Sequence, residues 1–559
     1  MTTQIQTPAI QVIPAPSKYQ KDVLAFVERY SAKNLFVKAV AGAGKTTVLR
    51  QLARKLQELA GNRRVLFVAF NKIIADGLKV KLAADGCSNI DCSTIHAFGM
   101  KALQRAYTDY QQAQAMKARK AGKPVPSAPK WQEVDKEKYS VLCADVMAPY
   151  ESQLIEFNEA LNGLKRLVNY AQLTLTDPKN EDALRDLVFH YNLEIEVADT
   201  FVWDIIWTSV SPVLDLGKKV WIEKGIVDFN DMVYLTARLK EVKVPLYDDV
   251  MVDESQDLNR AQLAVIRKAG KRFIMVGDPR QAIYGFSGAD TDSVNEIVAA
   301  LDCTVLPLSI CYRCPKWVAR LAAQVVPQIE ASETAEEGHV ERIELERFRA
   351  QVADGETIVL CRTTAPLVAE CLRLIREGIK ARVRGRDLGR GLVAIVKKIK
   401  KTYKGVSMDT IEHYLQEYAS RQRAVLEGKK DAEEKIAALN DRIETVQAFI
   451  EGYIIDQANG TIDGFYEYVN SKFSDDENGA VILSTVHRAK GLEFDNVYIL
   501  KGEQMPHKMA KADWQIEQEM NLLYVAITRT KKNLYFVGIV PASLNIEAAR
   551  AETVLALAS

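Results

Sequence analysis

A glycine-rich turn between a short apolar run and an amphipathic segment constrains the fold of this chain more than any other feature. The turn reads Ala39-Val40-Ala41-Gly42-Ala43-Gly44-Lys45-Thr46-Thr47, and the run Leu35–Val40 before it predicts a strand. The segment Val48–Leu52 after it continues as an amphipathic helix. Small residues let backbone N–H groups approach a polyphosphate, which then lies at the N-terminus of a helix. The residues expected to form this cradle are Gly42, Ala43, Gly44, Lys45, Thr46 and Thr47.

Two side chains of the turn are candidates for direct contact with the nucleotide. Lys45 is expected to reach the β- and γ-phosphates, and the Thr46 hydroxyl to ligate Mg²⁺. The turn departs from the pattern G-x-x-x-x-G-K-[ST] at one position, where Ala39 replaces the first glycine. At this point a chance glycine-rich turn is still an alternative, which other segments must exclude.

Strands and helices alternate along two parts of the chain. This alternation is typical of parallel sheets with helices on both faces. The segments between, about 100–225 and 390–475, are mostly helical in pattern, so we expect them to be insertions into α/β domains. The strands expected in the first part are 35–40, 64–70, 250–253 and 273–276, and in the second part 304–308, 357–361, 480–484, 496–500 and 533–537.

The second insertion is expected to contain two antiparallel helices over residues 411–450. An apolar seam with 3-4-3-4 spacing defines the second helix of the pair. A plain surface hairpin and a regulatory role through a protein partner are equally compatible with this pattern. The seam consists of Ile436, Leu439, Ile443, Val446 and Ile450.

A pair of carboxylates follows the apolar strand Val250–Val252. Asp253 and Glu254 are expected at the sheet edge where α/β folds bind their ligands. Asp253 suits the coordination shell of Mg²⁺, and Glu254 can orient and deprotonate a water that attacks the γ-phosphorus. An acidic turn without function would not normally follow a buried strand.

Composition narrows the class of protein without identifying it. At 559 residues the chain is too long for a single core. Its 74 basic and 73 acidic residues neither indicate nor exclude binding of nucleic acid. Salt screens the electric field of a charged group beyond about 10 Å, so a local basic groove can bind DNA in a protein of balanced net charge. No apolar run reaches the roughly 18 residues of a membrane span, and no secretion signal is recognised.

The cysteines point to a reducing compartment. The chain has eight, scattered without a disulfide-like framework, so an intracellular, cytoplasmic location is expected. Cys311 and Cys314 form an isolated C-x-x-C with no second pair at zinc-finger spacing. We therefore expect no metal at this pair.

An ordered set of motifs resembles superfamily 1 helicases of the UvrD/Rep/PcrA group, in a form most similar to the F-box DNA helicase branch. The central motif is Asp-Glu-Ser-Gln-Asp at 253–257. The other segments that carry the resemblance are 19–20, 69–72, 94–98, 227–232, 276–289, 308–313, 485–494 and 523–529. The resemblance implies two RecA-like domains in tandem, each with a helical insertion. The implied domains are 1–100 with 225–303 and 304–389 with 476–559, and the insertions are 101–224 and 390–475.

The resemblance implies that ATP binds between the two RecA-like domains. Arg313 and Arg529 of the second domain would then stabilise charge on the γ-phosphate in the transition state, an effect of about 10³–10⁵ in rate. Gln281 matches the γ-phosphate sensor. The remaining nucleotide contacts implied are Gln20 for the adenine, Glu493 for the ribose, and Gly491 of the same motif as Glu493.

The resemblance also implies a track for single-stranded DNA. Stacked bases contribute about 1–3 kcal/mol each without sequence preference, which suits a translocating enzyme. Some of the aromatic residues could instead belong to the core. The implied stacking residues are Phe70, Tyr284 and Phe286, and the implied polar contacts are Asn71, Thr94, His96 and His487.

The sequence departs from the family pattern at three places. Ser287 stands where relatives usually carry arginine, and Phe286 replaces a frequent tryptophan. Segment 390–475 is shorter than the large 2B domain of UvrD. Coupling efficiency and regulation by that domain are therefore not transferred to this chain.

The whole pattern predicts an ATP-driven translocase on single-stranded DNA and a DNA helicase of 3′→5′ polarity, acting at single-strand/duplex junctions. ATP and Mg²⁺ are the expected cofactors, and no membrane partner is expected. One alternative is a translocase that strips proteins from single strands and unwinds poorly. Another is a nucleotide-switched binding module that acts through the 411–450 hairpin. Repair, recombination, phage replication and defence are all compatible pathways.

Overall fold

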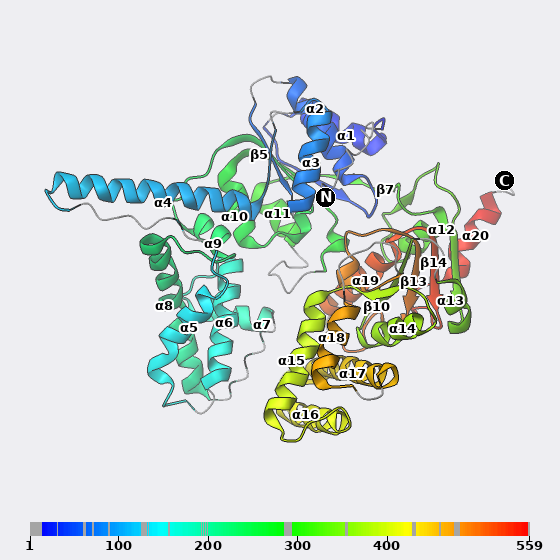
Figure 1. Ribbon diagram of the computed structural model, residues 1–559. Helices are drawn as coiled ribbons and strands as arrows, with labels where there is room; N and C mark the ends of the chain where they lie inside the picture. The colour runs from blue at the N-terminus through cyan, green and yellow to red at the C-terminus, as the bar shows by residue number, and fades with distance from the viewer. Residues whose placement is uncertain are drawn as a thin grey trace, which may run out of the picture. The chain divides into compact units, whose positions relative to one another are not determined.

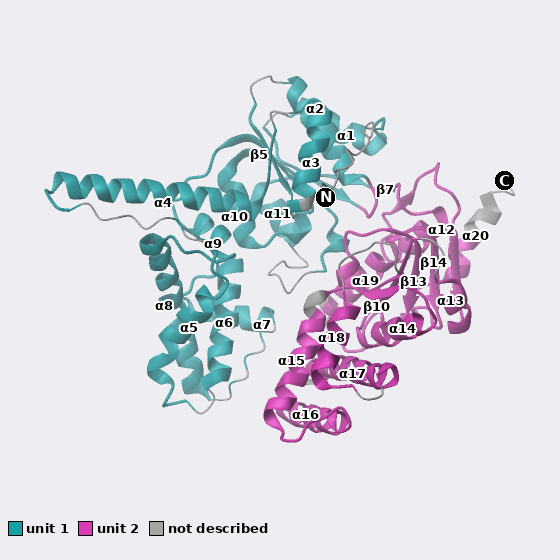
Figure 2. Ribbon diagram, viewed as in Figure 1, with its two compact units in different colours: residues 1–39, 44–308 teal, residues 40–43, 309–559 magenta. Residues whose placement is uncertain are grey.

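The computed structural model describes most of the chain, in two compact units (Figure 2). Unit 1 comprises residues 1–39 and 44–308, and unit 2 comprises residues 40–43 and 309–559. The described residues are 14–30, 32–59, 63–69, 72–87, 90–124, 131, 134–154, 157–191, 193, 195, 197, 199–283, 293–352, 356–427, 432–457, 460–473, 481–511 and 513–556.

Unit 1 is built on a six-stranded sheet in the order β3-β2-β4-β5-β1-β6. All neighbouring strands pair in parallel. Strand β2 is buried and apolar throughout, as expected where helices cover both faces of a parallel sheet. The strands are β1 (Leu35–Ala39), β2 (Val65–Ala69), β3 (Ile90–Thr94), β4 (Tyr247–Val252), β5 (Gly270–Gly277) and β6 (Thr304–Leu308). The predicted α/β class with parallel strands is thereby confirmed.

Strand β6 corrects one expectation. The sequence predicts Thr304–Leu308 as a strand of the second α/β segment, but it pairs in parallel with β1 at the edge of the first sheet. Asn34 holds the start of β6 in place. Its side-chain amide donates to Leu301 O at 2.5 Å, and its backbone carbonyl accepts from Thr304 N at 3.0 Å. The first unit therefore ends at Leu308 rather than before Thr304.

Helices flank the first sheet (Figure 1). They bury the apolar side chains of the sheet. Phe36, Val250 and Met275 contact residues of the flanking helices in one buried cluster. The helix α2 follows the glycine-rich turn directly, so the turn lies at its N-terminus. The helices are α1 (Lys18–Arg29), α2 (Lys45–Leu59), α3 (Lys72–Ala84), α10 (Arg260–Ala269) and α11 (Ser293–Leu301).

The first insertion has a helical core of its own. Leu103, Leu167 and Val210 belong to this separate buried cluster. A buried ion pair, Lys138 Nζ to Asp231 Oδ2 at 2.5 Å, ties its helices to the segment that returns to the sheet. The helices are α4 (Ile95–Lys120), α5 (Lys138–Met147), α6 (Phe157–Thr174), α7 (Glu181–His190), α8 (Thr200–Lys224) and α9 (Asp231–Arg238).

Unit 2 contains a second six-stranded parallel sheet, in the order β11-β12-β10-β13-β14-β9. Its strands are β9 (His339–Ile343), β10 (Thr357–Cys361), β11 (Ala381–Val383), β12 (Val481–Thr485), β13 (Phe494–Leu500) and β14 (Thr530–Val537). A separate pair of short strands, β7 (Ile310–Cys311) and β8 (Glu330–Ala331), precedes it. The flanking helices are α12 (Lys316–Ala323), α13 (Leu345–Gln351), α14 (Ala365–Arg376), α19 (Asp513–Ile527) and α20 (Ile546–Ala556).

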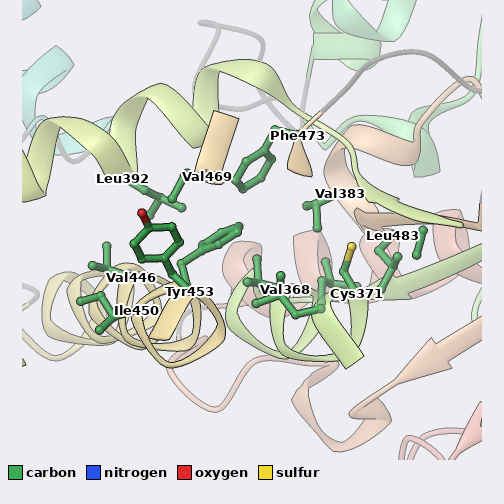
Figure 3. Packing of buried hydrophobic residues seen from close by; sticks show 14 of the residues in the cluster. Val368, Cys371, Val383, Leu392, Val446, Ile450, Tyr453, Val469, Phe473 and Leu483 are labelled. Atoms are coloured by element: carbon green, nitrogen blue, oxygen red, sulfur yellow. The ribbon is translucent and has the colours of Figure 1, made fainter. Parts of the chain in front are cut away.

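The second insertion shares one continuous core with this sheet (Figure 3). Val368 and Cys371 of α14 belong to the same cluster as Val446 and Tyr453 of the insertion. The predicted antiparallel pair is confirmed as α16 and α17: Gln416 bonds to Gln447 and Arg423 to Asn440, so the partner number falls as the residue number rises. The helices are α15 (Arg386–Thr402), α16 (Ile411–Leu426), α17 (Ala432–Asp456) and α18 (Ile462–Lys472).

Candidate active site

The glycine-rich turn has a backbone that only glycine adopts without strain at two positions. Gly42 and Gly44 have φ angles of +68° and +78°. A Cβ added at Gly42 would lie 2.7 Å from the Cβ of Arg313 and 2.9 Å from the Sγ of Cys311. Conformation and close packing therefore both exclude a side chain at Gly42.

Neighbouring residues hold both halves of the turn. Residues 40–43 group with unit 2, where Ala41 N donates to the Tyr524 hydroxyl at 2.7 Å and Tyr312 N donates to Gly42 O at 2.9 Å. In unit 1, a Cβ at Gly44 would lie 3.4 Å from the side-chain amide of Gln20. Gln20 is buried and closes a capping box with Ser17 at the start of α1.

These contacts predict a large effect for Gly42→Ala. We expect it to cost more than the roughly 1–2 kcal/mol of a left-handed residue, because the methyl group also meets Arg313 and Cys311. Gly86→Ala is the matched control, since Gly86 has φ +80° but open space around it. Nucleotide affinity and unfolding should be measured for both variants. Equal losses of stability and unchanged nucleotide binding would contradict the packing argument.

The predicted catalytic groups of unit 1 come together at the carboxyl edge of its sheet. Lys45 Nζ lies 2.8 Å from Glu254 Oε2, and the Lys45 side chain is only 12% exposed. The Thr46 hydroxyl donates to Asp253 Oδ2 at 3.5 Å. Lys45 and Thr46 begin α2 directly after the turn, and the two acids follow β4, so parallel strands bring both segments to one edge.

Negative charge exceeds positive charge at this edge. Burial alone would lower the pKa of Lys45, but attraction by Glu254, Asp278 and Asp253 outweighs it and raises that pKa. Burial, together with repulsion by Glu254, raises the pKa of Asp253 to about 6. Burial also raises the pKa of Asp278. One ammonium group does not balance the charge of these carboxyl groups, and the oxygen donors of Thr46 and Asp253 fit Mg²⁺.

Glu254 is held in an unusual conformation. Its φ angle of +51° is uncommon for a residue with a side chain, and such strain clusters at functional sites. Its N–H donates to Asp253 Oδ1 at 2.9 Å, and the Gln256 amide donates to Glu254 Oε2 at 2.6 Å. The backbone and a neighbouring side chain therefore both orient this carboxylate.

Gln256 connects the acidic pair to the predicted γ-phosphate sensor. Its side-chain oxygen accepts from Asp278 N at 3.0 Å, and Asp278 Oδ2 accepts from the Gln281 amide at 2.7 Å. All three side chains are buried. Sequence reasoning did not single out Gln256, although its place in Asp-Glu-Ser-Gln-Asp was a signal.

In unit 2 the two predicted arginines lie around Thr528. Arg313 Nη1 donates to Thr528 O at 3.3 Å, and Arg313 Nε forms an ion pair with Glu493 Oε2 at 2.5 Å. Arg529 is 1% exposed and donates to Val525 O, Leu492 O and the Thr528 hydroxyl at 2.9–3.2 Å. The residue expected to hold the ribose is thus a partner of one of the arginines. Gly491, two residues before Glu493, has a φ angle of +86°.

The described part of the predicted DNA track centres on His96. The Thr94 hydroxyl caps α4 by accepting from Ala97 N at 3.2 Å. The His96 ring lies 4.6 Å from the ring of Phe229, and burial lowers the pKa of His96. Phe229 is 57% exposed. Sequence reasoning missed Phe229 as a contact, although it lies in a segment that carries the resemblance. Phe70, Asn71, Tyr284, Phe286 and Ser287 lie outside the described residues.

His487 lies in a short turn (Val486–Ala489) after β12. Burial and the nearby Arg362 lower its pKa to about 4, although Glu519 opposes this shift. Arg362 itself donates to Glu519 at 2.8 Å. His487 is therefore neutral near pH 7 and suited to hydrogen bonding rather than to charge pairing. Sequence reasoning named neither Arg362 nor Glu519.

Two parallel α/β units, a phosphate-binding turn before a helix, and an acidic strand end beside its lysine define a P-loop nucleotide-binding protein. Residues 20–300 match the family of UvrD/REP helicase N-terminal domains, and residues 480–537 match UvrD-like helicase C-terminal domains. The chain belongs to the UvrD/Rep helicase family. The resemblance predicted from the motifs is confirmed.

Similar proteins extend the match over nearly the whole chain. F-box DNA helicase protein 1 of Schizosaccharomyces pombe is 23% identical over 89% of this chain and 55% of its own length. F-box DNA helicase 1 of Gallus gallus is 24% identical over 89% of this chain and 46% of its own length. ATP-dependent DNA helicase PcrA of Bacillus subtilis is 31% identical over 20% of this chain. The chain thus spans about half the length of the two F-box relatives. Among the described helices, none has the length and apolarity that crossing a membrane requires.

Proposed function

We propose that this chain is an ATP-dependent DNA translocase and helicase that hydrolyses ATP with residues of two RecA-like domains. The observation that carries the proposal is the contact of Lys45 and Thr46 with Glu254 and Asp253 in a chain of the UvrD/Rep family. Residues 101–224 and 390–475 are the proposed insertions of these domains. Several similar proteins are named as DNA helicases, which supports the proposed helicase activity.

The unit 1 residues divide the work of binding and hydrolysis. Lys45 would exchange Glu254 for the phosphates, which leaves the Glu254 carboxylate available to accept a proton from the attacking water. Gln256 keeps that carboxylate oriented during the exchange. Thr46 and Asp253 would hold Mg²⁺, which neutralises phosphate charge when bound.

The unit 2 residues would supply positive charge to the transition state. Arg313 must exchange Glu493 for a phosphate oxygen, and Glu493 is then available to the ribose. Arg529 is held by carbonyl groups and a hydroxyl, so its guanidinium is already oriented. We propose that these arginines and the unit 1 residues act on the same ATP molecule. Hydrolysis would then be linked to movement of the units.

We propose that single-stranded DNA lies over Thr94, His96 and Phe229. An exposed aromatic ring beside a neutral histidine and a hydroxyl offers stacking together with phosphate contacts, the combination found in sequence-tolerant single-strand binding. The residues implied by resemblance alone, Phe70, Asn71, Tyr284, Phe286 and His487, would extend this track.

Phe229→Ala tests the aromatic contact. We expect the affinity for single-stranded DNA to fall by about 1–3 kcal/mol, the usual value of one stacked base. Phe189→Ala is the matched control, because Phe189 is 72% exposed but lies at the end of α7 in the insertion. Fluorescence anisotropy with a labelled oligonucleotide measures both. Equal affinities for the two variants would remove Phe229 from the track.

Unwinding of tailed duplexes tests the proposed activity and its polarity. A duplex with a 3′ single-stranded tail should be unwound with ATP, and one with a 5′ tail should not. Displacement of a bound protein without unwinding would instead favour a protein-stripping translocase. ATP hydrolysis indifferent to DNA would favour a nucleotide-switched binding module acting through residues 411–450.

A further inference from the structure

The two cysteines of the C-x-x-C sequence enclose the arginine proposed to act on ATP. Cys311 ends β7, Cys314 lies two residues before the start of α12, and Tyr312 and Arg313 lie between the two cysteines. Both cysteines are buried, with 0% and 1% exposure. No group of three or more potential metal ligands occurs among the described residues, which leaves the pair outside any recognisable metal site there.

A hydrogen bond joins the two cysteines. The Cys314 N–H donates to Cys311 Sγ at 3.4 Å. Cys314 Sγ lies 3.9 Å from Thr528 O, the carbonyl that also accepts from Arg313. The Cys314 backbone therefore already contacts the Cys311 sulfur, and a bond between the two sulfurs would have a length of about 2.05 Å.

Cys311 has the electrostatic surroundings of a reactive thiol. Hydrogen bonding from Cys314 lowers its pKa to about 7 against the effect of burial, and the charge of Arg313 contributes in the same direction. Four other described cysteines are different, because burial raises the pKa of each to about 11 or 12. These are Cys92, Cys143, Cys303 and Cys371. Since the thiolate is the reactive form, Cys311 is the one suited to oxidation.

The phosphate-binding turn covers the Cys311 sulfur. A Cβ at Gly42 would lie only 2.9 Å from it, and the Gly42 carbonyl accepts from the N–H of Tyr312. The Tyr312 side chain beside it is 50% exposed. Because the turn covers the sulfur, we expect a small oxidant to reach it more readily than a bulky one.

We propose that Cys311 and Cys314 form a reversible dithiol–disulfide site, with a small hydroperoxide as oxidant, that controls the position of Arg313. The effect on ATP hydrolysis rests on the proposed function, whereas formation of the disulfide does not. In a reducing compartment such a bond would be transient, as regulatory disulfides are.

The chemistry balances with one peroxide for each pair. The Cys311 thiolate attacks a peroxide oxygen, the O–O bond breaks, and the leaving oxygen takes a proton to form water or an alcohol, which leaves a sulfenic acid on Cys311. The Cys314 sulfur then attacks the sulfenic sulfur. The S–O bond breaks, the S–S bond forms, and the hydroxyl leaves as water with the proton of the Cys314 thiol. The two thiols lose two electrons, and the peroxide gains them.

Closing this bond would restrain the residues that orient Arg313. The ring closed by the disulfide would contain the Arg313 backbone. Movement of the Cys314 sulfur toward Cys311 would disturb the contact of that sulfur with the Thr528 carbonyl. We expect the turnover of ATP to fall by about 10²-fold, the cost of moving a catalytic group by roughly 1 Å. Reduction should restore it.

The test treats the full chain with hydrogen peroxide and then counts thiols by alkylation in denaturant and mass spectrometry. The wild type should lose two of its eight thiols and the mass of two hydrogen atoms, and peptide mapping should join Cys311 to Cys314. Dithiothreitol should reverse the change. ATP hydrolysis is measured on the same samples, so an absent ATPase with an intact bridge would count against the proposed function only.

Two variants make the result specific. Cys314→Ser should form no bridge, and its ATP turnover should be unchanged once any sulfenic acid has been reduced. Cys303→Ser removes a thiol of raised pKa and should behave as the wild type. Eight alkylated thiols after peroxide, or a bridge that joins other cysteines, would overturn the proposal. A bridge that leaves ATP turnover unchanged in an active wild type would overturn the control of Arg313.

Discussion

Arg313→Ala is expected to lower kcat for ATP hydrolysis by about 10³–10⁵-fold, the usual value of a guanidinium that stabilises the transition state of phosphoryl transfer. The bond from Arg313 Nη1 to Thr528 O holds the side chain while Glu493 is exchanged for the phosphate, so the removal of Arg313 takes away a positioned charge rather than a mobile one. Nucleotide affinity should change far less than kcat. Steady-state hydrolysis and binding of a fluorescent nucleotide measure the two effects separately.

Arg320→Ala is the matched control for this prediction. Arg320 lies in α12 of the same unit, and its side chain is 24% exposed, close to the 22% of Arg313. Its removal should leave kcat within about twofold, because surface ion pairs contribute little. An Arg313→Ala variant that turns over ATP as fast as Arg320→Ala would exclude Arg313 from the chemistry.

Glu254→Gln should reduce kcat by about 10²–10⁴-fold, the usual contribution of a general base. The amide keeps the size of the side chain and a hydrogen-bonding oxygen for Lys45, but it cannot take a proton from water. ATP and single-stranded DNA should still bind. Glu223→Gln on the exposed face of α8 is the control and should leave hydrolysis unchanged.

A result against this assignment is easily recognised. Rapid ATP turnover by Glu254→Gln would place the base elsewhere, and the buried Asp278 would be the next candidate because its carboxyl lies in the same network. Loss of both nucleotide and DNA binding would show instead that Glu254 supports the fold of the site.

Local pattern predicted most of the elements that form the site. The strand 357–361 is observed with the same limits, and the turn at Gly42 and Gly44 lies between β1 and α2 as expected. Such features depend on neighbours in sequence: a short apolar run forms a buried strand, and glycine permits a left-handed turn. The acidic pair after β4 was predictable for the same reason.

The local sequence pattern did not predict which strands and helices pack together when they are far apart in the chain. The segment Thr304–Leu308 is a strand as expected, but its sheet is decided by pairing with β1 and by the bonds of Asn34. The pattern of the second insertion predicts helices, yet it does not reveal that Tyr453 shares a core with Val368 of α14. Both outcomes depend on contacts between residues far apart in the chain.

Pairings within the site were equally hidden. Motifs assign Arg313 and Glu493 separate roles, whereas the structure joins them in an ion pair. Phe229 gains its candidate role only because folding places its ring against His96. The role of Gln256 is likewise visible only from its hydrogen bonds to Glu254 and to the backbone of Asp278.

Steady-state ATP hydrolysis with and without single-stranded DNA tests the central claim most directly. A motor that uses Lys45, Glu254 and Arg313 on one ATP while gripping DNA should hydrolyse ATP slowly alone and at least about tenfold faster with DNA, since closure around the substrate completes the catalytic site. Hydrolysis at the same rate in both conditions, with DNA shown to be bound, would contradict the account.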